Sequence, residues 1–148
     1  MQTNDTDCPI IKLPFSIYSH ASIYSPLLKS TITCGGVNSS NGHTSLSSCS
    51  MLNQSGSQKA FPSMTDTRWG FAMASIENRL FAIGGICWNM LPNDACNMLE
   101  TILLDEKMES KFWTLEKRIP FSVSFHCVVT VGDNIIVTGG VGYRNKVS

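Results

Sequence analysis

The sequence predicts an all-β chain built from repeated four-stranded units, and three observations lead to that prediction. Only 15% of the 148 residues are charged, whereas a typical globular domain has about 25%. Short runs of β-branched and aromatic residues alternate with polar turns along the chain. Three of those runs end in a glycine pair, and the pairs recur about every 50 residues, a period that suits a four-stranded unit.

The glycine pairs mark equivalent positions of an internal repeat. The runs 30–34, 80–83 and 135–138 lead into Gly35 and Gly36, Gly84 and Gly85, and Gly139 and Gly140. The first glycines of successive pairs are separated by 49 and 55 residues. Glycine supplies unusual backbone dihedrals and lets backbones approach closely, so we interpret all six as structural.

Each glycine pair ends a predicted hairpin. In the second copy a strand at 68–76 precedes a polar turn at 77–79, and in the third a strand at 124–131 precedes the turn Gly132-Asp133-Asn134. Asn and Asp favour such turns because they tolerate left-handed backbone. The first copy, 19–28, contains Pro26 and lacks a clear turn, so it is the weakest match.

Further strands are predicted downstream of each hairpin. Residues 98–105 and 112–115 supply a third and a fourth strand in the second copy, and 45–52 and 59–61 do so in the first. Residues 9–13 fit the last strand of a preceding unit. Gln58 occupies the place in the first copy that Trp113 occupies in the second.

These residues resemble the kelch repeat over about residues 10–142. The pattern of that family is a strand ending in Gly-Gly, a variable loop, a further strand, a Trp before a proline-containing turn, and an Arg before the next hairpin. Gly84 and Gly85, Trp113, Pro120 and Arg68 match it. The first copy lacks the Trp and the Arg, and Val123 stands in the third copy where Arg68 stands in the second.

The resemblance implies an incomplete β-propeller, with about two full four-stranded blades plus partial blades. It divides the chain into a tail at 1–8, a partial blade at 9–36, kelch repeats at 37–85 and 86–140, and the end of a truncated blade at 141–148. Because propellers close with typically 4–8 blades, three explanations compete: a fragment of a longer protein, two copies that close a ring, or an open stack.

Charge and motifs exclude several classes of function. The formal net charge is zero, so no electrostatic footprint for nucleic acid or a polybasic membrane surface is present. Residues 1–14 lack the pattern of a secretory signal, and no apolar window is long enough to span a membrane. Metal-ligand spacings and phosphate-binding loops are absent from the sequence. We therefore expect a cytoplasmic, non-enzymatic protein without metal or cofactor.

Six cysteines are present, at 8, 34, 49, 87, 96 and 127. An even number in a short secreted chain would suggest a disulfide framework. The spacings are scattered, and Cys34 and Cys127 fall in apolar runs, so we favour reduced, buried thiols. His126 and Cys127 are adjacent in a predicted strand, so their side chains point to opposite faces and cannot share one site.

The resemblance also implies a partner-binding mouth at one end of the propeller. Carried over by position, its residues are His20, Val37, Ser39, Trp69, Gly70, Ile86, Trp88, Ser124, Val141 and Tyr143. Such a mouth is apolar and aromatic and suits a hydrophobic peptide anchor. The alternative for Trp69 and Trp88 is packing between blades.

The resemblance implies that the partner is a protein. The chain would then be a protein-interaction module, such as the substrate-recognition part of a cullin-RING ubiquitin ligase adaptor. An actin-binding or scaffold protein is the competing interaction role. A fragment of a propeller enzyme is the competing catalytic one.

Overall fold

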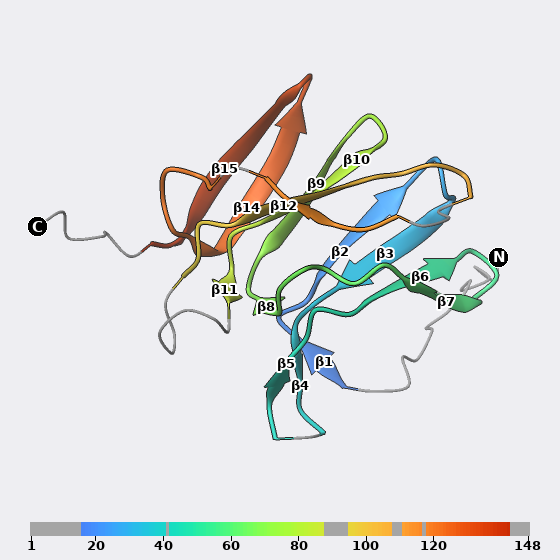
Figure 1. Ribbon diagram of the computed structural model, residues 1–148, viewed down its shortest axis with the longest axis horizontal. Helices are drawn as coiled ribbons and strands as arrows, with labels where there is room; N and C mark the ends of the chain where they lie inside the picture. Colours follow the sequence, from blue (N-terminus) through green and yellow to red (C-terminus); the bar gives the residue numbers. More distant parts are fainter. Residues whose placement is uncertain (1–15, 41, 88–94, 108–110, 117, 143–148) are drawn as a thin grey trace, which may run out of the picture.

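The computed structural model describes residues 16–40, 42–87, 95–107, 111–116 and 118–142 (Figure 1). These ranges contain strands and turns and no helix, which confirms the all-β prediction. Consequently, no helix in the described part of the chain is long and apolar enough to cross a membrane. The predicted strand at 9–13 lies outside the described residues.

The first sheet has four antiparallel strands in the order β2-β3-β6-β7. Their bounds are Ala21–Ser25, Ser30–Cys34, Cys49–Asn53 and Gln58–Phe61. The sequence suggested no clear turn between the first two strands, and this was wrong. The strands form a hairpin over five paired positions, and the turn closes where Lys29, with a φ of 47°, donates its backbone N–H to the Pro26 carbonyl (3.4 Å). Pro26 thus lies in the turn and does not interrupt the strand.

The second sheet repeats this arrangement with the order β9-β10-β12-β13. Its strands are Ala72–Ile76, Arg79–Ile83, Leu99–Leu103 and Thr114–Leu115. The third sheet contains two described strands, the hairpin of β14 (Ser124–Val131) and β15 (Asn134–Val141). The sheets follow one another as layers, and among the described strands no sheet closes on itself (Figure 1).

Short strands extend the hairpins beyond the glycine pairs. They are β1 (Ile17–Tyr18), β4 (Val37–Asn38), β5 (Thr44–Ser45), β8 (Arg68–Trp69) and β11 (Ile86–Cys87). β4 pairs with β1 and β5, and β11 pairs with β8. In each case the segment after the glycine pair pairs with the segment before the first strand of its own repeat.

Backbone conformation repeats along with the strand order. The first glycine of each pair has a φ between 61° and 68°, and the second has a φ between 87° and 95°. A third position repeats as well, because Ser19, Gly70 and Phe125 have φ values of 54°, 61° and 54°. An L-residue other than glycine seldom takes such a φ, so the surrounding structure must impose it on Ser19 and Phe125.

The core lies between the first and second sheets. It includes, among other buried residues, Ile32, Cys34 and Phe61 from the first sheet and Met73, Leu80, Ala82, Ile102 and Trp113 from the second. The Trp113 side chain is 2% exposed, and its indole Nε1 donates to the carbonyl of Pro62 (2.9 Å), which follows the last strand of the first sheet. Trp113 therefore joins the two sheets by apolar contact and by one hydrogen bond.

The prediction of reduced, buried thiols was wrong. Disulfides join Cys34 to Cys49 and Cys87 to Cys96. The first bond follows from strand register, because β3 and β6 place Cys34 directly opposite Cys49. The spacing of these two cysteines in the sequence does not reveal that they are paired. Cys127 is free but exposed, because strand alternation turns it away from buried His126 as expected. Cys8 lies outside the described residues.

Candidate interaction site

Backbone hydrogen bonds connect neighbouring repeats at the end of the molecule where the glycine pairs lie. Gly70 donates its N–H to the Ser19 carbonyl (2.9 Å), and Phe125 donates to the Gly70 carbonyl (2.7 Å). The second glycines make matching bonds, Gly36 to the Arg68 carbonyl (2.9 Å) and Gly85 to the Val123 carbonyl (2.8 Å). Equivalent segments of the three repeats are therefore held side by side.

The structure brings several of the predicted mouth residues together at this end. Ile86 lies opposite Trp69 and Val141 lies opposite Ser124, while Val37 lies opposite Tyr18. Their exposure differs. Val37 and Ser124 are buried, Ile86 and Trp69 are half-buried, and Val141 is 56% exposed. Val37 and Ser124 thus offer little surface to a partner, whereas Trp69, Ile86 and Val141 offer more.

The other predicted residues fall into three groups. His20 and Ser39 are exposed, and the Ser39 backbone N–H and hydroxyl both donate to the Ser16 carbonyl (3.2 and 3.3 Å). Gly70 is buried beneath Phe125, since a Cβ added to it would lie 3.0 Å from the Phe125 ring. Trp88 and Tyr143 lie outside the described residues.

Two aromatic residues at this end were missed in the sequence. Phe125 is 53% exposed, and its ring meets the Trp69 ring edge-on with centroids 5.5 Å apart. Tyr18 is 43% exposed, and its hydroxyl lies 3.1 Å from His43 Nδ1. We call Tyr18, Trp69 and Phe125 the aromatic row. Alignment of the repeats could have found Tyr18, because it stands where Trp69 stands one repeat later.

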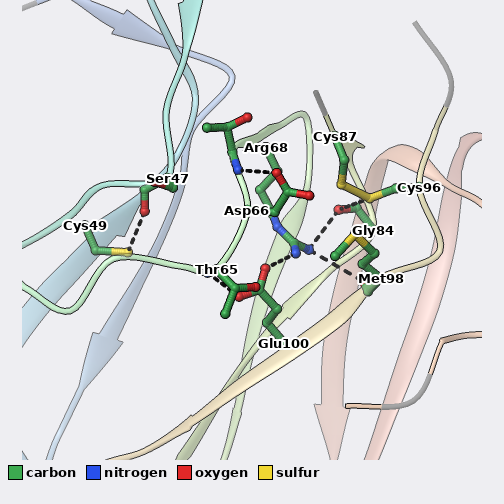
Figure 2. Close-up of polar contacts among 11 residues, drawn as sticks. Ser47, Cys49, Thr65, Asp66, Arg68, Gly84, Cys87, Cys96, Met98 and Glu100 are labelled. Atoms are coloured by element: carbon green, nitrogen blue, oxygen red, sulfur yellow. Dashed lines mark hydrogen bonds and ion pairs between the residues drawn. A yellow bond between two sulfur atoms is a disulfide. The ribbon is translucent and has the colours of Figure 1, made fainter. Parts of the chain in front are cut away.

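A buried ion pair includes the residue that precedes Trp69 in the sequence (Figure 2). The guanidinium of Arg68, the residue before Trp69, forms a salt bridge with Glu100, and both side chains are fully buried. Arg68 Nη1 also donates to the Gly84 carbonyl (3.2 Å), and the Thr65 N–H donates to the second Glu100 oxygen (2.7 Å). Burial lowers the pKa of Arg68, and the Glu100 charge opposes that shift. The pair fixes the backbone from which Trp69 projects.

His126 packs against the glycine pairs at this end. It is 7% exposed, neither ring nitrogen has a hydrogen-bond partner among the described residues, and burial lowers its pKa. The ring lies against Gly84, whose added Cβ would be 3.1 Å from the His126 Cε1 atom. Phe71 holds the equivalent place beside Gly35. Across the ranges that the structure describes, no group of three or more His, Cys, Asp or Glu could hold a metal ion.

Comparison with models of known protein families finds no match for this chain. A comparison with curated protein sequences also finds none.

Proposed function

We propose that this chain is a protein-interaction module of kelch-type repeats that binds an apolar or aromatic peptide segment at the aromatic row. The observation that carries the proposal is the position of Tyr18, Trp69 and Phe125. All three are partly exposed, and they stand on segments joined by backbone hydrogen bonds at one end of a rigid stack of sheets. Binding residues commonly sit on such scaffold ends.

The kelch part of the proposal is supported by the repeat itself. Two consecutive units have the same four-strand order, and the third begins with the same hairpin. The glycine pairs have matching φ values, and the second glycines of the first two repeats donate to the following repeat at equivalent carbonyls. Repeats that cover one another in this way form a continuous core, as propeller blades do.

The chemistry of the row favours an uncharged anchor. Aromatic side chains supply large contact area at low cost in conformational entropy, and Trp and Tyr are frequent hot spots of binding. Arg68 lies directly behind the row, but it is fully buried and paired with Glu100, so it is not available to an acidic peptide. We therefore expect a Leu, Phe or Trp side chain of the partner to pack against the exposed surface of Trp69 and Phe125, whose rings contact each other.

The disulfides bear on the choice among interaction roles. Such bonds persist in oxidising compartments and are rare in the cytosol. Cys34–Cys49 and Cys87–Cys96 therefore favour recognition outside the cytosol over the cytoplasmic location expected earlier and over a ubiquitin ligase adaptor. Mass spectrometry of the natural protein, alkylated before reduction, tests this point. Full alkylation of Cys34 and Cys49 would contradict it.

Selection from a random peptide library displayed on phage tests the binding site. Immobilised protein should enrich peptides with an aromatic or large aliphatic anchor, and calorimetry with synthetic copies should give one peptide per chain. Trp69→Ala and Phe125→Ala should each weaken binding about tenfold or more, as expected for hot-spot residues.

The matched control is Phe112→Ala. Phe112 is 75% exposed but lies just before β13, in the outer part of the second sheet. Its removal should leave peptide affinity unchanged. Peptides that bind all three variants equally well would show that the aromatic row is not the site.

A further inference from the structure

The acceptor pattern for N-linked glycans, Asn-x-Ser/Thr with any residue but proline at x, occurs three times in the sequence. The three patterns begin at Asn4, Asn38 and Asn53. Asn4 lies outside the described residues, so the structure compares the other two. So short a pattern also arises by chance, and the surroundings of each asparagine therefore decide whether a bulky sugar chain fits there.

Asn53 stands where a strand leads into an exposed loop. It is the last residue of β6, and all residues from 54 to 60 are exposed. The backbone N–H of Asn53 donates to the Ser57 carbonyl (3.1 Å), which closes the turn. A hollow of about 180 Å³ lies beside Asn53, with Leu28 and Met51 among its lining residues. The loop thus gives a glycan access to solvent and gives its first sugar room against the sheet.

The hydrogen bonds of the Asn53 side chain leave its amide nitrogen available. The Oδ1 atom accepts from the Ser55 N–H (3.1 Å), the Ser55 hydroxyl (2.8 Å) and the Ser57 N–H (2.8 Å). Among the described residues, Nδ2 of Asn53 makes no hydrogen bond. N-glycosylation replaces one hydrogen of Nδ2 and leaves the carbonyl oxygen as an acceptor. The turn and a glycan on Asn53 are therefore compatible.

The fold places Asn53 at the end of the first sheet that is remote from the glycine pair. β6 runs antiparallel to β3, and Asn53 lies opposite Ser30, the first residue of β3. Cys49, at the other end of β6, lies opposite Cys34, which directly precedes Gly35. The aromatic row stands at the glycine-pair end, so a glycan on Asn53 would leave the row open to a partner.

Asn38 has different surroundings. It belongs to β4, the middle strand of the sheet β1-β4-β5, so its backbone is paired on both sides. Its neighbour Val37 lies opposite Tyr18, a member of the aromatic row. A glycan on Asn38 would therefore stand beside the residues that we propose to bind a peptide. Of the two described acceptor patterns, the one at Asn53 fits both the fold and the proposed binding site.

We propose that Asn53 carries an N-linked glycan. The inference rests on the location outside the cytosol that forms part of the proposed function, because N-linked glycans and persistent disulfides both belong to the secretory pathway. In the transfer, Nδ2 of Asn53 bonds to the anomeric carbon of a lipid-linked oligosaccharide diphosphate and loses one proton. The bond between that carbon and the phosphate oxygen breaks, and the lipid diphosphate leaves. The strand β6 then carries a disulfide at Cys49 and a glycan at Asn53.

Mass spectrometry of the natural protein tests the proposal. Peptide N-glycosidase in water enriched in oxygen-18 converts a glycosylated Asn into a labelled Asp, and we expect the label at position 53 and unmodified Asn38. Unlabelled Asn53 in protein that retains the Cys34–Cys49 disulfide would overturn the glycan and leave the proposed location intact. Unlabelled Asn53 in protein with both cysteines alkylated before reduction would overturn the glycan and the location together.

Variants of the full chain, secreted from cultured insect cells with an added signal peptide, locate the glycan. Electrophoresis before and after deglycosylation should show one glycan fewer in Asn53→Gln and in Ser55→Ala than in the wild type. Ser57→Ala is the matched control and should keep the glycan, because Ser57 contacts Asn53 Oδ1 but is not part of the acceptor pattern. Equal glycan numbers in all four proteins would overturn the proposal. Asn53→Gln should bind the selected peptides as tightly as the wild type, so the aromatic row is tested independently.

Discussion

Arg68 and Glu100 form an ion pair whose two side chains have no exposed surface. Arg68 belongs to β8, just before the first long strand of the second sheet, and Glu100 belongs to β12 of that sheet. The contact therefore joins segments 32 residues apart in the sequence beneath the aromatic row. A buried pair adds little stability over an apolar contact, but loss of one partner leaves the other charge uncompensated.

Substitution of Glu100 should destabilise the fold severely. Glu100→Ala leaves the Arg68 guanidinium buried without its counter-charge, and the free energy of unfolding should fall by about 3–5 kcal/mol. Urea unfolding monitored by circular dichroism measures it. The control is Lys111→Ala, whose pairing with Asp105 is partly exposed (28% and 48%) and should cost about 0–1 kcal/mol. Equal losses in the two variants would contradict the argument.

Trp113→Ala should also be costly, because it empties a buried site between two sheets and removes the hydrogen bond to the Pro62 carbonyl. The expected loss is about 3–5 kcal/mol in the free energy of unfolding. Guanidinium titration detects it. Phe112→Ala, next in sequence but 75% exposed, should be nearly neutral. A small effect of Trp113→Ala would mean that the two sheets do not depend on this contact.

Alanine substitutions at Gly84 and Gly139 distinguish the cost of a positive φ from the cost of a steric clash at the new Cβ. Both have positive φ (61° and 68°), but a Cβ at Gly84 would lie 2.5 Å from the Val123 carbonyl oxygen, whereas a Cβ at Gly139 would meet no atom of the described residues within 4 Å. Gly139→Ala should cost about 1–2 kcal/mol for backbone conformation alone. Gly84→Ala should cost clearly more, because neighbouring backbone must move. Thermal unfolding compares them, and equal melting temperatures would refute the steric argument.

A lower pH should reduce the free energy of unfolding, and buried His126 should account for part of the reduction. Burial lowers its pKa in the folded protein, so below the unfolded value of about 6.5 the unfolded chain binds more protons. The stability contributed by neutral His126 is thus present above about pH 6.5 and is lost as the pH falls below it. His126→Phe copies Phe71, the residue at the equivalent position. Between about pH 7 and about pH 5, the free energy of unfolding of this variant should fall less than that of the wild type. Identical pH profiles would remove His126 as the cause.

Loss of the Cys34–Cys49 disulfide should lower the free energy of unfolding, mainly because the unfolded chain gains conformational entropy. The bond closes a separation of 15 residues, for which the chain-entropy model gives about 3 kcal/mol. The double variant Cys34→Ala, Cys49→Ala should therefore unfold at lower urea concentration than the wild type. Cys127→Ala is the control, since Cys127 is free. A double variant as stable as the control would contradict the prediction.

Local sequence patterns predicted most of the strands, but they did not predict the turn at 26–29 or the two disulfides. The runs before the glycine pairs became β3, β10 and the first part of β15, because alternating residues between polar turns carry their own signal. The turn at 26–29 was missed, since its four residues have no standard two-residue hairpin signature. Cys34–Cys49 was missed because its pairing depends on strand register, which spacing along the chain does not reveal. Cys87–Cys96 was missed because it joins β11 to a residue outside the strands.

The interaction site was predictable only in part. Trp69, Ile86 and Val141 were carried over from the repeat, and the structure places each of them in a cross-strand pair beside a glycine pair; that they bind a partner stays a prediction. Exposure was not predictable, and Val37 and Ser124 proved to be buried by neighbouring segments. Phe125 was not among the positions carried over from the repeat, although strand alternation between buried Ser124 and buried His126 turns it to solvent.

By itself, the sequence determined that the chain is all-β, that it is repetitive with a period near 50 residues, and that two of its glycine pairs end strands. The prediction was wrong for the third pair, because β15 continues through Gly139 and Gly140 to Val141. These features depend on residues close together in the chain, which is why they could be recognised without coordinates. Only the tertiary structure decided that Cys34 faces Cys49, that Glu100 neutralises Arg68, and that the Trp113 indole donates to the Pro62 carbonyl. Each of these depends on which distant segments pack together, a choice made by burial and register over the whole fold.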